Sequence, residues 1–341
     1  MRCLIPLVLG FCLVTLALTP AAPPLIPGLD LRALCDHSDV IVVGRALHVR
    51  EGKSTTVVIQ GKSFPGRHML VELSVERVMK GRAEGTALTF SFSVPSVAIV
   101  STGYGEVLAG QFGIFFLRKS DGGHEVLDPY HPFVIAAPGA PQASGNLLDQ
   151  VTAEVTHVLR SVQVSSDVKE QALWVLNNVR TPVATAAIRA ATRNQPLSVR
   201  LIAIGALLAR NDISELDAAE DTLLHPPQNV NQNLVAGVAS AIRFGVKDPR
   251  AIPTLARLLK SGDVNVRRGA ASALRSTQDQ GAIKPLAQAL YDTDGEVLYQ
   301  AVIGLAEITG TTGEWAPASD TFLKNPQRYL DHWRDWAKAN K

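Results

Sequence analysis

The residue types that most often do chemistry in proteins are spread thinly along this sequence. Five of the eight histidines lie within residues 30–138, at His37, His48, His68, His124 and His131. Zinc sites draw on histidines and cysteines at short, regular spacing. None of these histidines forms an HxH or HxxxH pair, and no cluster of cysteines accompanies them. We therefore predict scattered surface or strand histidines, no metal site and no cofactor.

One acidic cluster stands out in the second half, at Asp217, Glu220 and Asp221. Two neighbouring carboxylates can serve as a general acid and a general base. A run of charges in a helical segment is more often a solvated face, and we favour that interpretation. Residues 147–341 contain no nucleophile elbow, no HExxH sequence and no phosphate-binding loop. The sequence thus predicts no catalytic residues and a protein that is not an enzyme.

The N-terminus has the pattern of a secretory signal peptide. Arg2 supplies a positive charge, residues 4–18 are mostly apolar, and small residues follow at Ala21 and Ala22. The apolar run is short for a membrane span, which needs about 20 residues. We expect a signal peptide at 1–22, a secreted or periplasmic protein, and no stable membrane span after cleavage. An uncleaved membrane anchor is the alternative.

The cysteines and the net charge limit the remaining possibilities. Cys3 and Cys12 fall inside the predicted signal, so the mature chain keeps Cys35 alone. One cysteine cannot form an internal disulfide, and we expect Cys35 to be a small buried side chain. A net charge of +2 over 341 residues argues against nucleic-acid binding, which relies on a basic patch. The oligomeric state is left open.

Apolar alternation predicts a small β domain at residues 30–138. Met69, Val71, Leu73 and Val75 alternate with polar or outward positions, which is the period of a half-buried strand. A turn-like segment at 36–39 precedes the first strand, and glycine-rich turns separate the others. Short strands with such turns suggest an antiparallel β-barrel. The predicted strands are 40–44, 68–78, 87–94, 110–117, 124–127 and 133–136.

Three segments carry a resemblance to a known family. They are CDHSDVIVVGRAL at 35–47, VELSVERVMKG at 71–81 and LAGQFGIF at 108–115. In this order they resemble the netrin-like domain of tissue inhibitors of metalloproteinases, a barrel of the OB type. Those inhibitors bind the protease zinc through a free N-terminal cysteine flanked by disulfides. Cys35 is internal and has no partner, so the resemblance implies the fold and not the inhibition.

A second domain begins after a linker at residues 139–146, which is uncharged and rich in proline, glycine and alanine. In residues 147–341 one pattern recurs, of the form V-[RK]-x-x-A-[AIL]-x-A-L. Its copies begin at Val168, Val199, Leu234, Val266 and Val297, which are 31, 35, 32 and 31 residues apart. A period of this length is typical of a solenoid of repeated helix pairs. In the best copy we expect Val266, Ala270, Ala273 and Leu274 to be core.

The repeats resemble HEAT repeats of the short type that also occurs in phycobilisome lyase-like proteins. The second half of the unit recurs at 248–259 and 279–290. In that family an Asp before the first helix and an Arg within it often form a ladder between neighbouring repeats. The resemblance implies a ladder at Arg200, Asp263, Arg267 and Asp294. Val235 and Leu298 occupy the Arg position in other copies and would interrupt it.

The final helix, at 325–336, has an aromatic face. Tyr329, Trp333 and Trp336 are spaced i, i+4, i+7 and share one side. One hypothesis is a cap that seals the open end of the solenoid, because a terminal repeat must cover its apolar face. The other is an aromatic patch that binds a partner. We favour the cap.

We predict a multidomain α and β protein in which an OB-like β-barrel precedes an α-solenoid. Its expected function is that of an exported, non-enzymatic scaffold that binds a protein partner. A solenoid offers an extended concave face, which we expect the second helices to line. The candidate contact residues are Arg250, Arg257, Lys260, Lys284 and Gln288. The alternatives are a protease-inhibitor-like module acting through the barrel, or an enzyme with a composite site at the domain junction.

Overall fold

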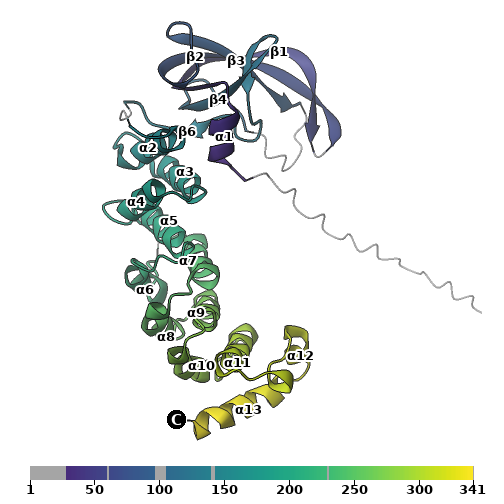
Figure 1. Cartoon of the computed structure of the whole chain (residues 1–341), viewed down its shortest axis with the longest axis vertical. Helices are drawn as coiled ribbons and strands as arrows, with labels where there is room; N and C mark the ends of the chain where they lie inside the picture. The colour runs from purple at the N-terminus through teal and green to yellow at the C-terminus, as the bar shows by residue number, and fades with distance from the viewer. Residues whose placement is uncertain (1–27, 60, 97–104, 140–142, 229, 341) are drawn as a thin grey trace, which may run out of the picture.

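The computed structural model describes residues 28–59, 61–96, 105–139, 143–228 and 230–340. The predicted signal peptide at 1–22 and the centre of the predicted linker lie outside these residues. Within them, an N-terminal β-sheet with one short helix is followed by a long array of helices (Figure 1). In the described part of the chain, no helix has the length and apolar character needed to cross a membrane.

A six-stranded sheet forms the N-terminal domain. Its strands follow the order β1-β2-β3-β5-β4-β6, and β1 also pairs with β4, so that the pairings lead back to β1. Most pairings are antiparallel, and a single parallel pair, Ser91 with Glu125, joins β3 to β5. The elements are α1 (Leu31–His37), β1 (Val40–Ile59), β2 (Lys62–Lys80), β3 (Ala87–Pro95), β4 (Phe112–Ser120), β5 (Gly123–Val126) and β6 (Val134–Ile135).

Burial along β2 confirms the predicted alternation. Val71 and Leu73 are fully buried, whereas Leu70, which lies on the opposite face of the strand, is exposed. The structure extends two predictions. β1 continues past Gly44 to Ile59 as a ribbon on β2, because backbone pairing holds residues whose side chains at 50–54 are exposed. The segment predicted as a turn, 36–39, instead begins as the end of the helix α1, which runs to His37. Asp30 caps this helix by accepting from the Ala33 N–H at 2.9 Å.

The helical array consists of first and second helices in alternation. The predicted repeat starts fall in α3, α5, α7, α9 and α11, which stack on one another in that order. The helices are α2 (Leu147–Arg160), α3 (Ser166–Asn177), α4 (Pro182–Ala190), α5 (Leu197–Leu208), α6 (Leu216–Leu224), α7 (Gln232–Gly245), α8 (Ile252–Leu258), α9 (Val264–Ser276), α10 (Ile283–Ala289), α11 (Gly295–Thr309), α12 (Ser319–Lys324) and α13 (Pro326–Ala339).

Small residues bring the first helices into close contact. A Cβ on Gly269 of α9 would lie 2.6 Å from the Ala239 carbonyl oxygen of α7, so the two backbones nearly touch. An array bends toward the layer that packs more tightly. Accordingly α7, α9 and α11 lie on the inner side of the curve and α6, α8 and α10 on its outer side (Figure 1). The second helices, which we expected on the concave face, therefore lie on the outer side.

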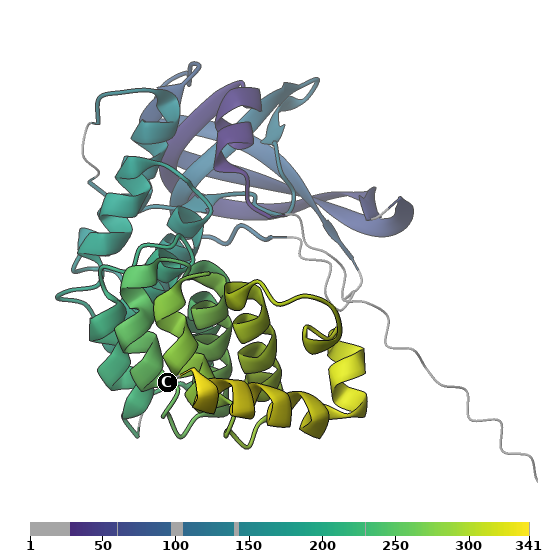
Figure 2. The same ribbon diagram turned by 60° about the horizontal axis from the view of Figure 1, so that its bottom comes forward.

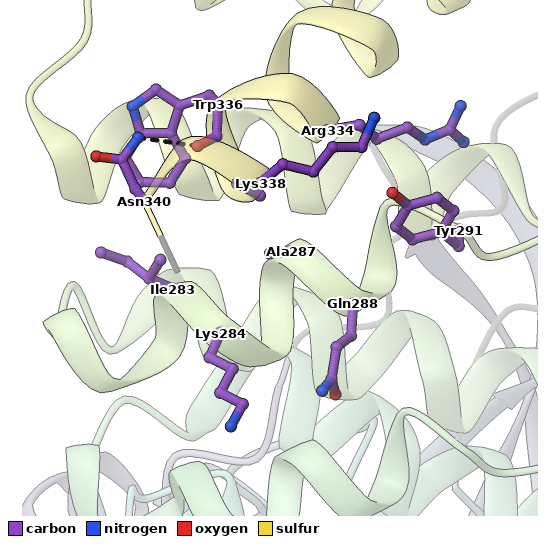
Figure 3. Close-up of a pocket in the computed structure, with 10 residues that line it drawn as sticks. Ile283, Lys284, Ala287, Gln288, Tyr291, Arg334, Trp336, Lys338 and Asn340 are labelled. Carbon is purple, nitrogen blue, oxygen red and sulfur yellow. Dashed lines mark hydrogen bonds between the residues drawn. The ribbon is translucent and has the colours of Figure 1, made fainter.

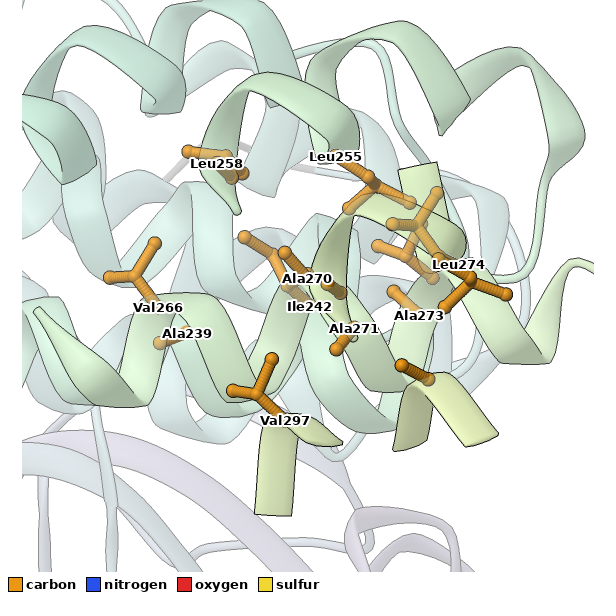
Figure 4. Close-up of a cluster of buried hydrophobic side chains, with 14 of the residues drawn as sticks. Ala239, Ile242, Leu255, Leu258, Val266, Ala270, Ala271, Ala273, Leu274 and Val297 are labelled. Atoms are coloured by element: carbon orange, nitrogen blue, oxygen red, sulfur yellow. The ribbon is translucent and has the colours of Figure 1, made fainter. Parts of the chain in front are cut away.

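The core of the repeats contains the residues that the sequence register predicted. Val266, Ala270, Ala273 and Leu274 are all fully buried. They pack with apolar residues of α7 and α8, among them Leu255 (Figure 4). Each fully buried leucine contributes roughly 2 kcal/mol of transfer free energy. This confirms that the repeated pattern is a packing pattern.

A second core joins the sheet to the helices. Ile41 and Phe116 of the sheet belong to the same buried cluster as Val151 and Val155 of α2. α2 also packs on α3 and α4. It therefore covers the first end of the helical array and at the same time one end of the sheet.

Candidate functional site

The last helix closes the far end of the array with its aromatic face. Trp333 is fully buried, and Tyr329 is nearly so, in the core of the repeats. The indole N–H of Trp333 donates to the Trp315 carbonyl oxygen at 3.0 Å. Figure 2 shows α13 lying across the end of the array. Trp336, the third aromatic residue, remains half-buried at the edge of this cap.

A hollow of about 680 Å³ opens between α10 and α13, beside Trp336. Ile283 and Ala287 lie on the side of α10 that faces α13, and Tyr291 follows one turn later (Figure 3). Lys284 and Gln288 occupy the next stripe of α10, and their side chains point away from α13 (Figure 3). The α13 side is lined by Arg334, Trp336, Ala337, Lys338 and Asn340.

A smaller hollow of about 200 Å³ continues along the array toward α8. Lys260 lines it from just beyond α8. Gln288 and Tyr291 line both hollows, so the two form one surface. We call this surface the α8–α10–α13 face. It presents an apolar floor with polar side chains along both edges.

The charged side chains that line the main hollow are all basic. Lys284, Arg334 and Lys338 border the main hollow, and none of its described lining residues is acidic. The smaller hollow includes Asp292, but Arg267 already binds that carboxylate at 2.8 and 3.1 Å. Positive charges at the edge of an apolar hollow favour an anionic ligand.

Two of the cations are held in place by neighbours. The Arg334 guanidinium lies 4.8 Å from the centre of the Tyr291 ring and donates to the Leu290 carbonyl oxygen at 2.7 Å. Lys338 donates to Asp335 at 2.8 Å, and this hydrogen bond raises the pKa of the Lys338 ammonium. Both side chains of the second pair are largely exposed. Lys284 has no ion pair within the ranges that the structure describes.

Three of the five predicted contact residues meet on this face. Lys260, Lys284 and Gln288 line the two hollows. The other two are engaged within the chain: Arg250 binds its neighbour Asp248 at 2.6 Å, and Arg257 binds Glu220 of α6 at 2.7 Å. On α13, the sequence pointed to Trp336 only through the alternative of an aromatic binding patch. It missed Arg334, Ala337, Lys338 and Asn340, because repeat spacing does not say where a terminal helix lies. The i, i+4 series Ile283, Ala287, Tyr291 was a signal of a second apolar stripe.

Of the four predicted ladder residues, Arg267 and Asp294 form ion pairs between repeats, but with other partners than each other. Arg267 binds Asp292, while Asp294 is bound by Arg268 at 2.9 and 2.7 Å. This interaction lowers the pKa of Asp294 to about 2. Asp263 caps α9 and accepts from the Asn265 N–H at 2.7 Å. Arg200 is apart from these links, and its Nε is buried without a hydrogen-bond partner among the described residues.

The acidic cluster and the histidines have structural roles where the structure describes their contacts. Asp217 accepts from the Thr254 hydroxyl at 2.6 Å, and Glu220 binds Arg257, so α6 is tied to α8. His131 binds Asp128 at 2.8 Å. No group of three or more His, Cys, Asp or Glu side chains that could hold a metal ion occurs among the described residues.

Comparison with known proteins identifies the helical region. Residues 216–306, from α6 into α11, match a family model for HEAT repeats. The chain therefore contains a region of HEAT-type helical repeats. No curated protein matches the chain.

Solved structures are also similar to this chain, and two of them cover about half of it. One is a designed armadillo repeat protein in complex with the peptide (KR)4, at 15% sequence identity and a TM-score of 0.35, covering 48% of this chain and 87% of that one. The other is human deoxyhypusine hydroxylase in complex with glycerol, at 14% identity and a TM-score of 0.25, covering 56% of this chain and 74% of that one.

Proposed function

We propose that this protein is a non-enzymatic scaffold that binds another protein through the α8–α10–α13 face. The observation that carries the proposal is the continuous pair of hollows with an apolar floor and basic edges. HEAT-type repeats commonly serve as interaction scaffolds, because their stacked helices present extended surfaces. Typical ligand-binding hollows measure about 300–1,000 Å³, and the main hollow is within that range.

The residue types of the face support binding of a protein. Tyr, Trp and Arg are the residues that most often dominate interface energies. Tyr291, Arg334 and Trp336 stand together here, and all three remain partly accessible. The described lining of the main hollow contains no carboxylate, and Asp292 of the smaller hollow is bound by Arg267. The proposal therefore gives the face a recognition role and no catalytic one.

The proposal extends to the N-terminal part of the chain. We place a cleaved signal peptide at 1–22, which would make the mature protein secreted or periplasmic. We also assign the sheet domain to the OB-type, netrin-like barrels; the pairing of β1 with both β2 and β4 supports this. N-terminal sequencing of the native protein tests the export proposal. A mature chain that still begins at Met1 would indicate an uncleaved anchor or no export.

Cross-linking from inside the hollow tests the proposed function. A photoreactive amino acid at Ala287 lies in the main hollow, and the same group at Lys324 of α12 is an exposed control. We expect a discrete protein adduct from position 287 that position 324 does not give. The purified adduct partner should then bind the wild-type chain and lose affinity for Ala287→Trp, which fills the hollow. Equal binding by this variant would reject the site.

A second candidate is binding through the sheet domain, the inhibitor-like alternative. One observation favours it: a hollow of about 850 Å³ lined by Arg82, Lys119 and His124. Incubation of the full mature chain with a zinc protease tests this candidate. Inhibition that Lys119→Glu abolishes would favour it, and unchanged protease activity would reject it.

A further inference from the structure

We infer that the segment bound by the α8–α10–α13 face is an acidic stretch of polypeptide that inserts one bulky apolar side chain between α10 and α13. This inference rests on the proposed function and specifies its ligand. It follows from the separation of charge and apolar surface within the face.

The centre of the main hollow requires an apolar group. Ile283 and Ala287 line it from α10, and Trp336 and Ala337 line it from α13. A polar side chain placed there would lose its water without gaining a partner. An aromatic or large aliphatic side chain would instead bury surface on both helices and contact the indole of Trp336.

The edges of the hollow require negative charge on both sides of that apolar group. Lys338 stands on the α13 edge, Lys284 on the opposite edge of α10, and Lys260 farther along the smaller hollow. A segment that crosses α10 would therefore meet cations before and after its apolar residue. Charge complementarity of this kind speeds association and excludes basic competitors.

The present partners of these cations leave them accessible to a ligand. The exposed pair of Lys338 with Asp335 contributes little, because water and salt screen it. A carboxylate of the bound segment can share or replace it. Gln288 lies between the two hollows and offers an amide that can donate to and accept from an extended backbone.

Synthetic peptides test the inference with the full mature chain. The probe is a fluorescein-labelled peptide in which one Phe is flanked on both sides by Glu, measured by fluorescence anisotropy. Matched peptides replace every Glu by Gln, every Glu by Lys, or the Phe by Ala. We expect affinity to fall at least about tenfold for each matched peptide, and the binding of the Glu peptide to weaken with added salt.

Protein variants connect this binding to the face. Lys284→Glu combined with Lys338→Glu should weaken binding of the Glu peptide at least about tenfold and should improve binding of the Lys peptide. Lys324→Glu makes one of these charge changes on α12, outside the face, and should leave both affinities unchanged. Ala287→Trp should remove the dependence on Phe.

Several results would overturn the inference. These are equal affinity for the Glu and Lys peptides, an unchanged affinity in the double variant, or binding to anionic lipid vesicles in place of the peptide. The proposed function can survive such a result. If the cross-linked native partner is still lost in Ala287→Trp while the acidic peptides fail, the face binds protein but the ligand chemistry is wrong.

Discussion

Arg77 of β2 holds the buried carboxylate of Glu154 on α2 through two hydrogen bonds, of 3.0 and 2.9 Å. The two residues lie in different domains, and Glu154 is 3% exposed. Burial raises the pKa of Glu154, and Arg77 opposes that rise. The ion pair therefore fixes the sheet to the helical array at a point where neither charge is easily replaced.

Arg77→Ala should destabilise the protein by roughly 3 kcal/mol at neutral pH, because it leaves a buried carboxylate without its partner. Loss of Arg77 raises the folded-state pKa of Glu154 further. Stability is then retained while Glu154 is protonated and is lost as pH rises through that pKa. The difference from wild type should therefore shrink as pH falls through this raised pKa, and it should be smallest below the ordinary carboxyl value of 4.5.

Urea unfolding across pH measures this difference. Arg82→Ala is the matched control, because Arg82 is an exposed arginine near the end of the same strand. It should change stability by less than about 0.5 kcal/mol. An Arg77→Ala variant as stable as Arg82→Ala at neutral pH would show that the junction does not depend on the ion pair.

Asp294→Asn should remove an ion pair while keeping a helix cap. Asp294 accepts from the backbone N–H groups of Glu296 and Val297 at 3.1 Å, a role that Asn can fill. Its carboxylate also binds Arg268, which depresses the pKa from 3.8 to about 2. A depressed pKa stabilises the fold above pH 3.8, and this contribution is lost as pH falls through about 2.

We expect Asp294→Asn to lower stability by about 1 to 2 kcal/mol at neutral pH, with the difference vanishing near pH 2. Chemical denaturation at several pH values tests this expectation. Asp263→Asn is the control, because it makes the same change at the cap of α9. A difference for Asp294→Asn that persists unchanged at pH 2 would contradict the assigned role of its charge.

Two glycine substitutions should shift stability in opposite directions. A Cβ at Gly269 would meet the Ala239 carbonyl oxygen at 2.6 Å, so Gly269→Ala should destabilise by about 1–3 kcal/mol. Gly237 lies within α7 with nothing within 4 Å of a new Cβ, so Gly237→Ala should stabilise by about 0.5–1 kcal/mol. Thermal unfolding reports both signs. Equal effects would contradict the close packing of α7 on α9.

Substitutions of two tryptophans on α13 should distinguish a role in closing the end of the array from a role in binding a partner. Trp333→Ala should destabilise by about 3–5 kcal/mol, because its indole is fully buried. Trp336→Ala should change stability much less and should weaken partner binding, since this side chain lines the hollow. Unfolding and affinity are measured on both variants. Loss of stability without loss of affinity in Trp336→Ala would support the cap hypothesis for the whole aromatic face.

Periodicity carries most of what the sequence reveals about the fold. The repeat register placed Val266 and Leu274 in the core, because each helix pair buries the same positions against its neighbours. Alternation of apolar residues located β2, because alternate side chains of this strand, such as Val71 and Leu73, are buried on one face of the sheet. The far part of β1 has no such signature, because its residues at 50–54 are exposed and backbone pairing with β2 keeps them in the ribbon.

The candidate site was predicted only in part. Exposed residues of the second helices could be selected from the register, and Lys260, Lys284 and Gln288 do line the hollows. The other wall comes from α13, which follows the last repeat and obeys no period. Its position over α10 is set by burial of Trp333 and by the hydrogen bonds of Arg334 to Leu290, which are tertiary contacts.

Hydrogen–deuterium exchange of the full chain, with and without the partner found by cross-linking, tests the central claim most directly. Binding at the α8–α10–α13 face should slow exchange in residues 283–291 and 334–340, which line the main hollow. Exchange in β1 and β2 should stay the same. Protection confined to the sheet domain or to α7 and α9, with 283–291 and 334–340 unchanged, would contradict the account.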